Sequence, residues 1–291
     1  MHALWVCFLP GPEEKIRARG NPLAPGLQED GELIKKEVRY EKDVSCYFFI
    51  LFLFGGIIVN AGDEKISVEG RYFMPTLSAT LKVSDSLPNP TKVDDDMLNI
   101  KRENFVDIRA SIKLAESQKL RLSYMPISYS GRTTITQDIV FGDQRFVAGQ
   151  RVLTDLDMDY LRLGWFYRLI KKEGVDLSAV LEAKGYIAKA RLEAPDQGAR
   201  HTYKVKVGIP TVGLSLDAGL GKGFGFLVEG TGISAGSRGY LYDLEGGLKW
   251  VPHRNFCVDA GYRIYQVKFE KGDDYFKMKL GGPYLGVRIL F

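Results

Sequence analysis

Residues 103–115, ENFVDIRASIKLA, alternate between apolar and polar side chains along their length. Because successive side chains of a β-strand point to opposite faces, this stretch predicts a strand with one apolar and one charged face. The apolar face carries Val106, Ile108, Ala110, Ile112 and Leu114. The polar face carries Asp107, Arg109, Ser111 and Lys113. Such a strand needs a different environment on each side.

The same alternation recurs along the chain after residue 62. It predicts ten strands, at residues 64–83, 103–115, 119–140, 150–170, 175–190, 203–219, 224–234, 239–251, 255–269 and 275–291. Short connections alternate with mostly longer ones, which is typical of antiparallel neighbours in an up-and-down barrel. The 32 glycines, 15 tyrosines and 16 phenylalanines also favour β structure with tight turns.

Two of the predicted strands change phase. In residues 155–170, DLDMDYLRLGWFYRLI, three aspartates alternate with apolar residues, and from Leu161 the apolar residues move to the odd positions. In residues 203–219, YKVKVGIPTVGLSLDAG, the phase changes near Pro210. Since proline cannot donate a ladder hydrogen bond, one interpretation is a β-bulge there. The other is that the aspartates extend beyond the region in which the phase matters.

Charge and cysteine content exclude several classes of protein. The formal net charge is only +4 and the charges are interspersed, so nucleic-acid binding is not predicted. Processing that removes Cys7 and Cys46 leaves Cys257 alone, which excludes an internal disulfide framework. The sequence contains neither a CxxC motif nor a cluster of histidines and cysteines. We therefore expect no metal site and no cofactor.

Residues 46–62, CYFFILFLFGGIIVNAG, differ from the rest of the chain. Basic residues precede an apolar run of about a dozen residues, and small residues follow it, which predicts a signal peptide at residues 43–61 with cleavage after Ala61. The run is shorter than the ~20 residues that a transmembrane helix needs. We interpret residues 1–42 as a disordered extension or as sequence upstream of the true translation start. We expect residues 62–291 to form the folded domain.

This folded part resembles the small outer-membrane β-barrel proteins of Gram-negative bacteria. The resemblance rests on the signal peptide, the ten alternating strands and the ending GVRILF at residues 286–291. It implies an all-β, antiparallel, up-and-down transmembrane barrel, porin-like in architecture and located in the cell outer membrane, with apolar side chains toward lipid and a polar interior. Aromatic residues near predicted strand ends would form interfacial girdles, namely Tyr72, Phe73, Trp165, Phe166, Tyr167, Trp250 and Tyr284.

With the apolar faces outward, a set of charged side chains would point into the lumen. The set comprises Glu69, Arg71, Asp107, Arg109, Lys113, Arg121, Arg162, Arg168, Glu182, Lys184, Asp217, Glu229, Asp243, Glu245, Lys249, Asp259, Arg263 and Arg288. A ten-stranded barrel is narrower than a porin with 16–18 strands, and buried charges need partners. We therefore expect a plugged lumen and a structural or surface-binding role. The alternative is a narrow channel or transporter for small solutes or ions.

The last strand has an apolar face that consists of Leu285, Val287, Ile289 and Phe291. We expect this strand to pair with the first one and close the ring, so that no backbone edge is left unpaired in lipid. The resemblance implies that this ending is the signal read by the barrel-assembly machinery. The other expected partners are outer-membrane lipid and lipopolysaccharide, and we expect a monomer.

The residues also bear on two further classes of function. The omptin proteases are ten-stranded outer-membrane barrels with acidic pairs and an Asp–His pair at the outer rim. Here Asp155, Asp157 and Asp159 lie close in sequence, but the only histidines after residue 61 are His201 and His253, so that pattern is not matched. We expect no enzymatic activity. A hydrolase of omptin or lipid-modifying type and a lipocalin-like carrier of apolar ligands are the alternatives.

Overall fold

The computed structural model describes residues 65–82, 93–94, 96, 98–141, 144–271 and 274–291. The interpretations of residues 1–42 and 43–61, including cleavage after Ala61, lie outside this part. The strands are β1 (Ile66–Phe73), β2 (Thr76–Lys82), β3 (Val93–Asp94), β4 (Phe105–Ala115), β5 (Gln118–Thr134), β6 (Ile139–Phe141), β7 (Gln144–Phe146), β8 (Arg151–Lys172), β9 (Val175–Ala194), β10 (Ala199–Gly221), β11 (Phe224–Ser234), β12 (Gly239–His253), β13 (Phe256–Lys271) and β14 (Asp274–Leu290). Two short 3-10 helices are η2 (Pro195–Gln197) and η3 (Gly236–Arg238). Among the described residues, no helix combines the length and the apolar character needed to cross a membrane.

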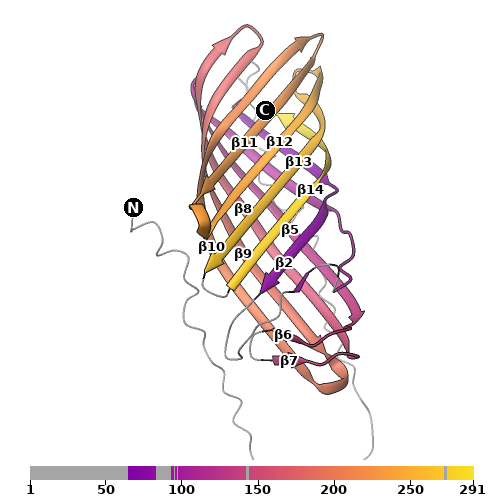
Figure 1. The fold of residues 1–291 in the computed structure, drawn as a ribbon. Helices are drawn as coiled ribbons and strands as arrows, with labels where there is room; N and C mark the ends of the chain where they lie inside the picture. Colours follow the sequence, from indigo (N-terminus) through magenta and orange to yellow (C-terminus); the bar gives the residue numbers. More distant parts are fainter. Residues whose placement is uncertain (1–64, 83–92, 95, 97, 142–143, 272–273) are drawn as a thin grey trace, which may run out of the picture. The chain divides into compact units, whose positions relative to one another are not determined.

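The long strands form an antiparallel barrel that closes on itself (Figure 1). Its ten members in ring order are β1 with β2, then β4, β5, β8, β9, β10, β11, β12, β13 and β14. Each is hydrogen-bonded to its neighbours in the sequence, which is the up-and-down order. The predicted fold class and the ten predicted strands are therefore confirmed. The small β6–β7 hairpin lies in the connection between β5 and β8.

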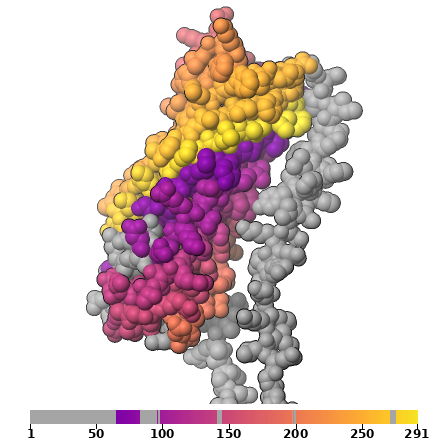
Figure 2. Space-filling view, turned by 90° about the vertical axis from the view of Figure 1, so that its right-hand side faces the viewer, coloured from indigo at the N-terminus to yellow at the C-terminus, as the bar shows by residue number. Residues whose placement is uncertain are grey.

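The ring closes between the first and the last strand. β1 pairs with β14 from Ser67 opposite Leu290 to Phe73 opposite Tyr284. The Phe291 amide donates to the Ile66 carbonyl at 2.8 Å, and its own carbonyl accepts from the Lys65 amide at 3.0 Å. Figure 2 shows the indigo first strand lying directly beside the yellow last strand. The expected closure of the ring is confirmed.

β1 and β2 together make one member of the ring although Met74 and Pro75 separate them. The register with β14 continues unchanged, since Thr76 lies opposite Gly281, three residues on from the Phe73–Tyr284 pair. The Met74 amide donates to the Pro283 carbonyl at 3.0 Å and maintains this ladder across the gap. The interruption therefore leaves the ring closed.

The half of the barrel nearer the C-terminus and the short turns has an apolar outer surface. Many large side chains there are well exposed, and examples are Val106, Leu122, Leu163, Leu181, Val212, Leu214, Leu244, Leu248, Leu285 and Val287. The side chains that alternate with them are buried inside and are mostly charged. Exposed apolar surface on this scale marks contact with a membrane or a partner. An apolar exterior around a polar interior is the arrangement of a transmembrane barrel.

The other half of the barrel reverses this arrangement. Its interior is apolar and includes Leu77, Ile127, Tyr129, Met158, Val207, Val267, Met278 and Leu280. Its outer face carries polar residues on the same strands, including Thr76, Ser128, Asp157, Lys189, Lys206, Lys277 and Lys279. This half therefore has the inside and outside of a water-soluble barrel. The strands pass from one environment to the other without changing which side chains point inward.

This reversal explains the two changes of phase in the sequence. The register between β5 and β8 runs without a shift from Gln118 opposite Tyr167 to Thr134 opposite Arg151. The register between β9 and β10 is likewise continuous through Pro210, which lies opposite Ala183. The interpretation of a bulge at Pro210 is therefore wrong. The second interpretation is correct, because the aspartates of β8 lie beyond the apolar band.

The expected aromatic girdle is only partly present. Tyr72, Trp165, Tyr167 and Trp250 are exposed on the outer face. Phe73, Phe166 and Tyr284 are instead buried inside, with exposed fractions of 2%, 2% and 3%. Their positions in the alternation place them on the inward face, which overrides the general preference of aromatic residues for interfaces. Their assignment to a girdle was wrong.

Candidate functional site in the barrel interior

Arg109 of β4 occupies the centre of the charged half of the interior. Its guanidinium donates to Asp107 Oδ2 at 2.8 and 2.9 Å, and to Glu245 Oε1 and Oε2 at 2.9 and 2.8 Å. Glu245 belongs to β12, which is not a neighbour of β4 in the ring. Arg71 of β1 donates to the same glutamate at 3.0 Å. These bonds connect three strands through the middle of the barrel.

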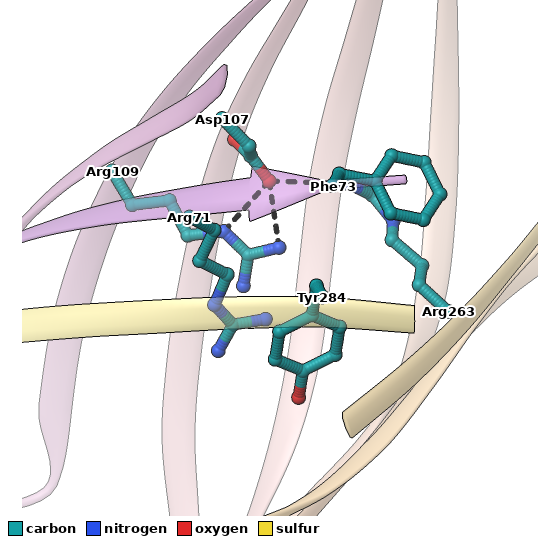
Figure 3. A pocket seen from close by; sticks show the side chains of 6 residues that line it. All are labelled: Arg71, Phe73, Asp107, Arg109, Arg263 and Tyr284. Atoms are coloured by element: carbon teal, nitrogen blue, oxygen red, sulfur yellow. Dashed lines mark hydrogen bonds and ion pairs between the residues drawn. The ribbon is translucent and has the colours of Figure 1, made fainter. Parts of the chain in front are cut away.

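One carboxylate oxygen of Asp107 accepts hydrogen bonds from three arginines. Besides Arg109, Arg162 Nη2 donates to Asp107 Oδ2 at 2.9 Å and Arg263 Nη1 does so at 3.1 Å. Figure 3 shows the bonds from Arg109 and Arg263 meeting at this carboxylate, beside Arg71 and Tyr284. Buried guanidinium groups are tolerated only when carboxylates compensate them, and Asp107 does so for several at once.

Asp243 of β12 is the second carboxylate that several basic side chains contact. Arg263 donates to its two oxygens at 2.8 and 2.7 Å, and Lys184 Nζ lies 3.0 Å from Oδ2. The Tyr160 hydroxyl donates to the same oxygen at 3.1 Å. Lys184 also donates to Glu182 at 2.5 Å, and its side chain has no exposed surface. A buried lysine is therefore held between two carboxylates of different strands.

The remaining predicted lumen residues surround these centres. Glu69 bonds Arg71 and accepts from Arg288 Nε at 2.8 Å, and Asp259 Oδ2 lies 3.2 Å from Arg71 Nη2. Arg121 bonds Glu229. The pairs nearest the short turns are more exposed, and they are Lys249 with Asp217, Lys113 with Glu116 and Arg168 with Asp176. Most of the predicted set is buried, whereas Lys113, Arg168, Asp217, Lys249 and Arg288 are only partly buried. Glu116 and Asp176 are partners that sequence reasoning missed.

Gly286 of β14 makes room for this network. It points inward, and a Cβ added there would lie 2.6 Å from Asp259 Oδ1 and 3.0 Å from Arg71 Cγ. Both distances are too short for a side chain to fit without displacing the ion pair. Glycine is therefore required at this position by the close approach of two charged side chains, and its backbone geometry plays no part.

An aromatic and apolar layer lies next to the charged one. The rings of Tyr160 and Tyr186 stack at 4.9 Å, and the Tyr265 ring lies 5.5 Å from that of Tyr160. Phe105 meets Tyr129 edge-on at 5.2 Å. Sequence reasoning missed this layer because its residues were not separated from the outward apolar faces. The signal was present, since Met158 and Tyr160 share the even positions of inward-facing Arg162 and Phe166.

The two layers meet at a small hollow in the interior. It is lined by Arg71, Phe73, Asp107, Arg109, Arg263 and Tyr284 (Figure 3). The hollow has no room for a water molecule. Paired charges lie on one side of this level and aromatic rings on the other.

The candidate catalytic residues lie apart from this interior. Asp155, Asp157 and Asp159 point outward, where Asp155 lies 3.6 Å from Arg191 and the other two accept hydrogen bonds from hydroxyl groups of β5. His253 is exposed near a short turn, and its Nδ1 accepts from the Asn255 amide at 3.4 Å. His201 lies far along the chain on β10. In the described part of the chain, no three histidine, cysteine or acidic residues form a cluster that could hold a metal ion.

The connection between β5 and β8 is ordered by one carboxylate. Asp138 accepts from the Ala148 amide at 2.9 Å and from Arg145 Nη2 at 2.7 Å. The amide hydrogen bond, followed by the arginine, lowers the pKa of this carboxyl group below its usual value. Ile139 and Phe146 of the same connection are fully buried against the wall formed by β8 to β10. This segment therefore packs as part of the barrel.

Comparison with protein-family models and with curated proteins finds no match. Among solved structures, the chain is similar to the outer-membrane protease OmpT of Escherichia coli, at 10% identity and a TM-score of 0.48, covering 77% of this chain and 97% of that one. It is also similar to the translocator domain of autotransporter NalP from Neisseria meningitidis (10%, 0.43, 80% and 90%) and to Ail of Yersinia pestis (16%, 0.33, 79% and 100%). The closed antiparallel ring, with apolar side chains outward and ion pairs inward, gives this chain the fold of an outer-membrane β-barrel protein.

Proposed function

We propose that this chain is an integral protein of the cell outer membrane whose barrel is closed to solutes and whose role is structural or surface-binding. The observation that carries the proposal is the pair of stacked interior layers. A solute would have to separate ion pairs such as Arg109 with Glu245 and then displace the stacked rings of Tyr160 and Tyr186. Separating a buried pair leaves uncompensated charges, which is strongly unfavourable.

Single-channel recording in planar lipid bilayers tests this proposal. We expect the purified, folded protein to insert without producing a stable conductance, because a permeating solute would have to separate the buried ion pairs and displace the stacked rings. A wide porin recorded in the same bilayers shows that the assay detects a pore. A stable and reproducible conductance of the unmodified protein would overturn the closed barrel and favour the narrow channel.

Basic side chains on the outer face support the proposed lipid partners. Lys277 and Lys279 of β14 are exposed directly beyond the apolar band, and Lys268 lies opposite Lys277 on β13. Lysines at this level can reach the phosphate groups of lipid headgroups. We infer that lipopolysaccharide and other anionic lipids surround this part of the barrel. The expected monomeric state stays a prediction.

The last strand supports the proposed contact with the barrel-assembly machinery. Leu285, Val287, Ile289 and Phe291 all point outward, and between 41% and 52% of each side chain is exposed. These four residues form a continuous apolar face to which another protein can bind before the ring closes. Whether the chain has catalytic activity is a separate matter, and the expectation that it has none stays a prediction.

A further inference from the structure

β10 is much longer than the strand that follows it in the ring. It pairs with β9 from Ala199 to Ala218, whereas its pairing with β11 begins only at Val212. The β9–β10 hairpin reaches the end of the barrel at which β6 and β7 lie (Figure 1). Within the described residues, no strand pairs with the second side of β10 between Ala199 and Thr211. This segment is an open sheet edge, here called the β10 edge.

The ladder with β9 determines which backbone groups the β10 edge presents. The Gly219 amide donates to the Gly174 carbonyl at 2.6 Å, in the same register as the β9–β10 ladder. Because opposite residues in an antiparallel pair alternate between bonded and non-bonded, the odd residues of β10 bond to β9. The even residues direct their backbone groups away from β9. On the open segment these residues are Arg200, Thr202, Lys204, Lys206 and Gly208, while Pro210 has no amide to offer.

The side chains of the β10 edge have a definite chemistry. Lys204 and Lys206 are exposed on the outer face, and the neighbour of Lys204 across the ladder is Lys189. Asp157 of β8 lies on the other side of Lys189 and can compensate that charge, whereas no carboxylate lies opposite Lys204 or Lys206 on β9. On the inner face, Val205 and Val207 are half-buried and Ile209 is buried. Between residues 204 and 207 the segment therefore has lysines outside and valines inside, and nearer Ala199 its inner face carries His201 and Tyr203.

We propose that the β10 edge binds an extended acidic segment of another protein by strand addition. Backbone groups of the five even residues would form the ladder, as in other cases in which a peptide adds to a sheet edge. The preferred segment alternates acidic residues, which face Lys204 and Lys206, with aliphatic residues that continue the inner layer beside Val205 and Val207. Thr202 lies between Arg200 and Lys204 and gives a neutral site.

Charge argues against a second copy of this chain as the occupant. Two β10 edges paired with each other would bring the lysines at positions 204 and 206 of both copies together without any carboxylate between them. Exposed lysine and proline on an edge strand are devices that prevent unspecific pairing. At the β10 edge, the two lysines and Pro210 disfavour pairing with a neutral or basic strand. The carboxylates of an acidic strand would instead compensate the two lysine charges. Pro210 ends the accessible ladder next to the point where β11 begins to pair.

A fluorescently labelled peptide of eight residues that alternates Glu and Val provides the test, with the full-length protein held in lipid nanodiscs. We expect saturable binding by fluorescence anisotropy, and weaker binding of a matched peptide that alternates Lys and Val. The double substitution Lys204→Glu with Lys206→Glu should weaken the binding of the Glu–Val peptide and strengthen the binding of the Lys–Val peptide. Each affinity should change by about three- to tenfold, because each cross-strand charge pair contributes a fraction of a kcal/mol to about 1 kcal/mol. The matched control is Lys277→Glu with Lys279→Glu on β14, which should leave the preference unchanged.

N-methylation of the peptide backbone separates strand addition from simple charge attraction. Methylating the amides of one alternate set should abolish binding, while methylating the other set should leave it intact, since only one set faces the edge. Equal effects of the two sets, or no binding of the unmethylated peptide, would overturn the proposal. So would a result in which the β10 lysine variants change only the binding of anionic lipid vesicles, or in which the protein dimerises through this edge. None of these outcomes depends on whether the barrel conducts.

Discussion

Single side chains act across the whole width of this barrel. Arg109 and Glu245 are 136 residues apart, yet two hydrogen bonds join them through the interior. In an up-and-down barrel, backbone bonds connect only neighbouring strands. The ion pairs therefore add the connections between distant strands that the backbone cannot supply. They can do so because inward-facing glycines such as Gly286 leave space for long side chains.

Replacing Arg109 with alanine should destabilise the barrel by about 3–5 kcal/mol, because Asp107 and Glu245 would keep buried charges with fewer partners. Urea unfolding of the protein in phospholipid vesicles, followed by tryptophan fluorescence, measures this change. Arg168→Ala is the matched control, since Arg168 and Asp176 are both partly exposed near a short turn. It should cost less than about 1 kcal/mol. Equal losses in both variants would show that Arg109 is not central.

At the scale of the strand, alternation alone fixed much of the fold but left the environments undetermined. The predicted limits of β4 and β14 differ from the observed ones by at most two residues, and those of β11 agree with them. Alternation shows that the two faces of a strand differ, but it does not show which face meets lipid, water or protein. At Tyr160 and Leu161 of β8 the environment reverses while the direction of the side chains continues. In the sequence of a single strand, that reversal looks the same as a β-bulge or a register shift. Only the pairing with the neighbouring strands distinguishes them.

The predicted lumen residues were easier to find than their partners. Arg162 and Asp243 could be placed inside from the pattern of their own strands. That Arg162 lies 3.6 Å from Asp243 and 2.9 Å from Asp107 depends on the curvature and closure of the ring. No spacing within one strand encodes those distances. The pairing therefore becomes visible only once the barrel is closed.

β14 is the element whose end we expect to matter for assembly. Phe291→Ala should lower the amount of folded, heat-modifiable protein in outer membranes several-fold, because it removes the terminal aromatic group of the apolar face. Semi-native gel electrophoresis of isolated outer membranes measures this amount. The purified variant should still refold in detergent, since the backbone bonds of residue 291 to Lys65 and Ile66 do not need its side chain.

The matched control for this experiment is Phe256→Ala on β13. Phe256 lies opposite Ile289 at the same end of the barrel and is exposed to a similar degree, 37% compared with 42% for Phe291. It should leave assembly nearly unchanged. If both variants assembled equally poorly in cells, loss of aromatic surface rather than loss of an assembly signal would explain the result.

As a whole, the molecule combines two kinds of barrel in one set of strands. One half has lipid-facing side chains around paired charges, and the other has polar side chains around an apolar interior. The two interiors meet at residues such as Phe73, Arg263 and Tyr284 (Figure 3). The border between lipid and water on the outside should therefore lie close to this level.

Cysteine labelling in lipid nanodiscs locates that border. Lys206→Cys and Leu214→Cys introduce thiols on the outer face of the same strand, and both positions are well exposed in the isolated barrel. We expect a charged maleimide to react rapidly at position 206 and slowly at position 214, because lipid covers the latter. Unfolding the protein in urea should raise the second rate to that of position 206. Cys257 is buried, and the unsubstituted protein gives the background from the native cysteines. Similar rates at both positions in the folded protein would contradict the assignment of the apolar band.

The reversal of inside and outside also determines the immersion depth of the protein. If the barrel moved deeper into the membrane by a few residues of strand length, Asp157 and Lys206 would enter the hydrocarbon. If it moved outward by the same length, leucines such as Leu214 would be exposed to water. Both displacements are unfavourable, and they oppose each other on every long strand. The aqueous part of β9 and β10 is thus presented at a constant height above the lipid. A partner that approaches within the plane of the membrane meets it at that level.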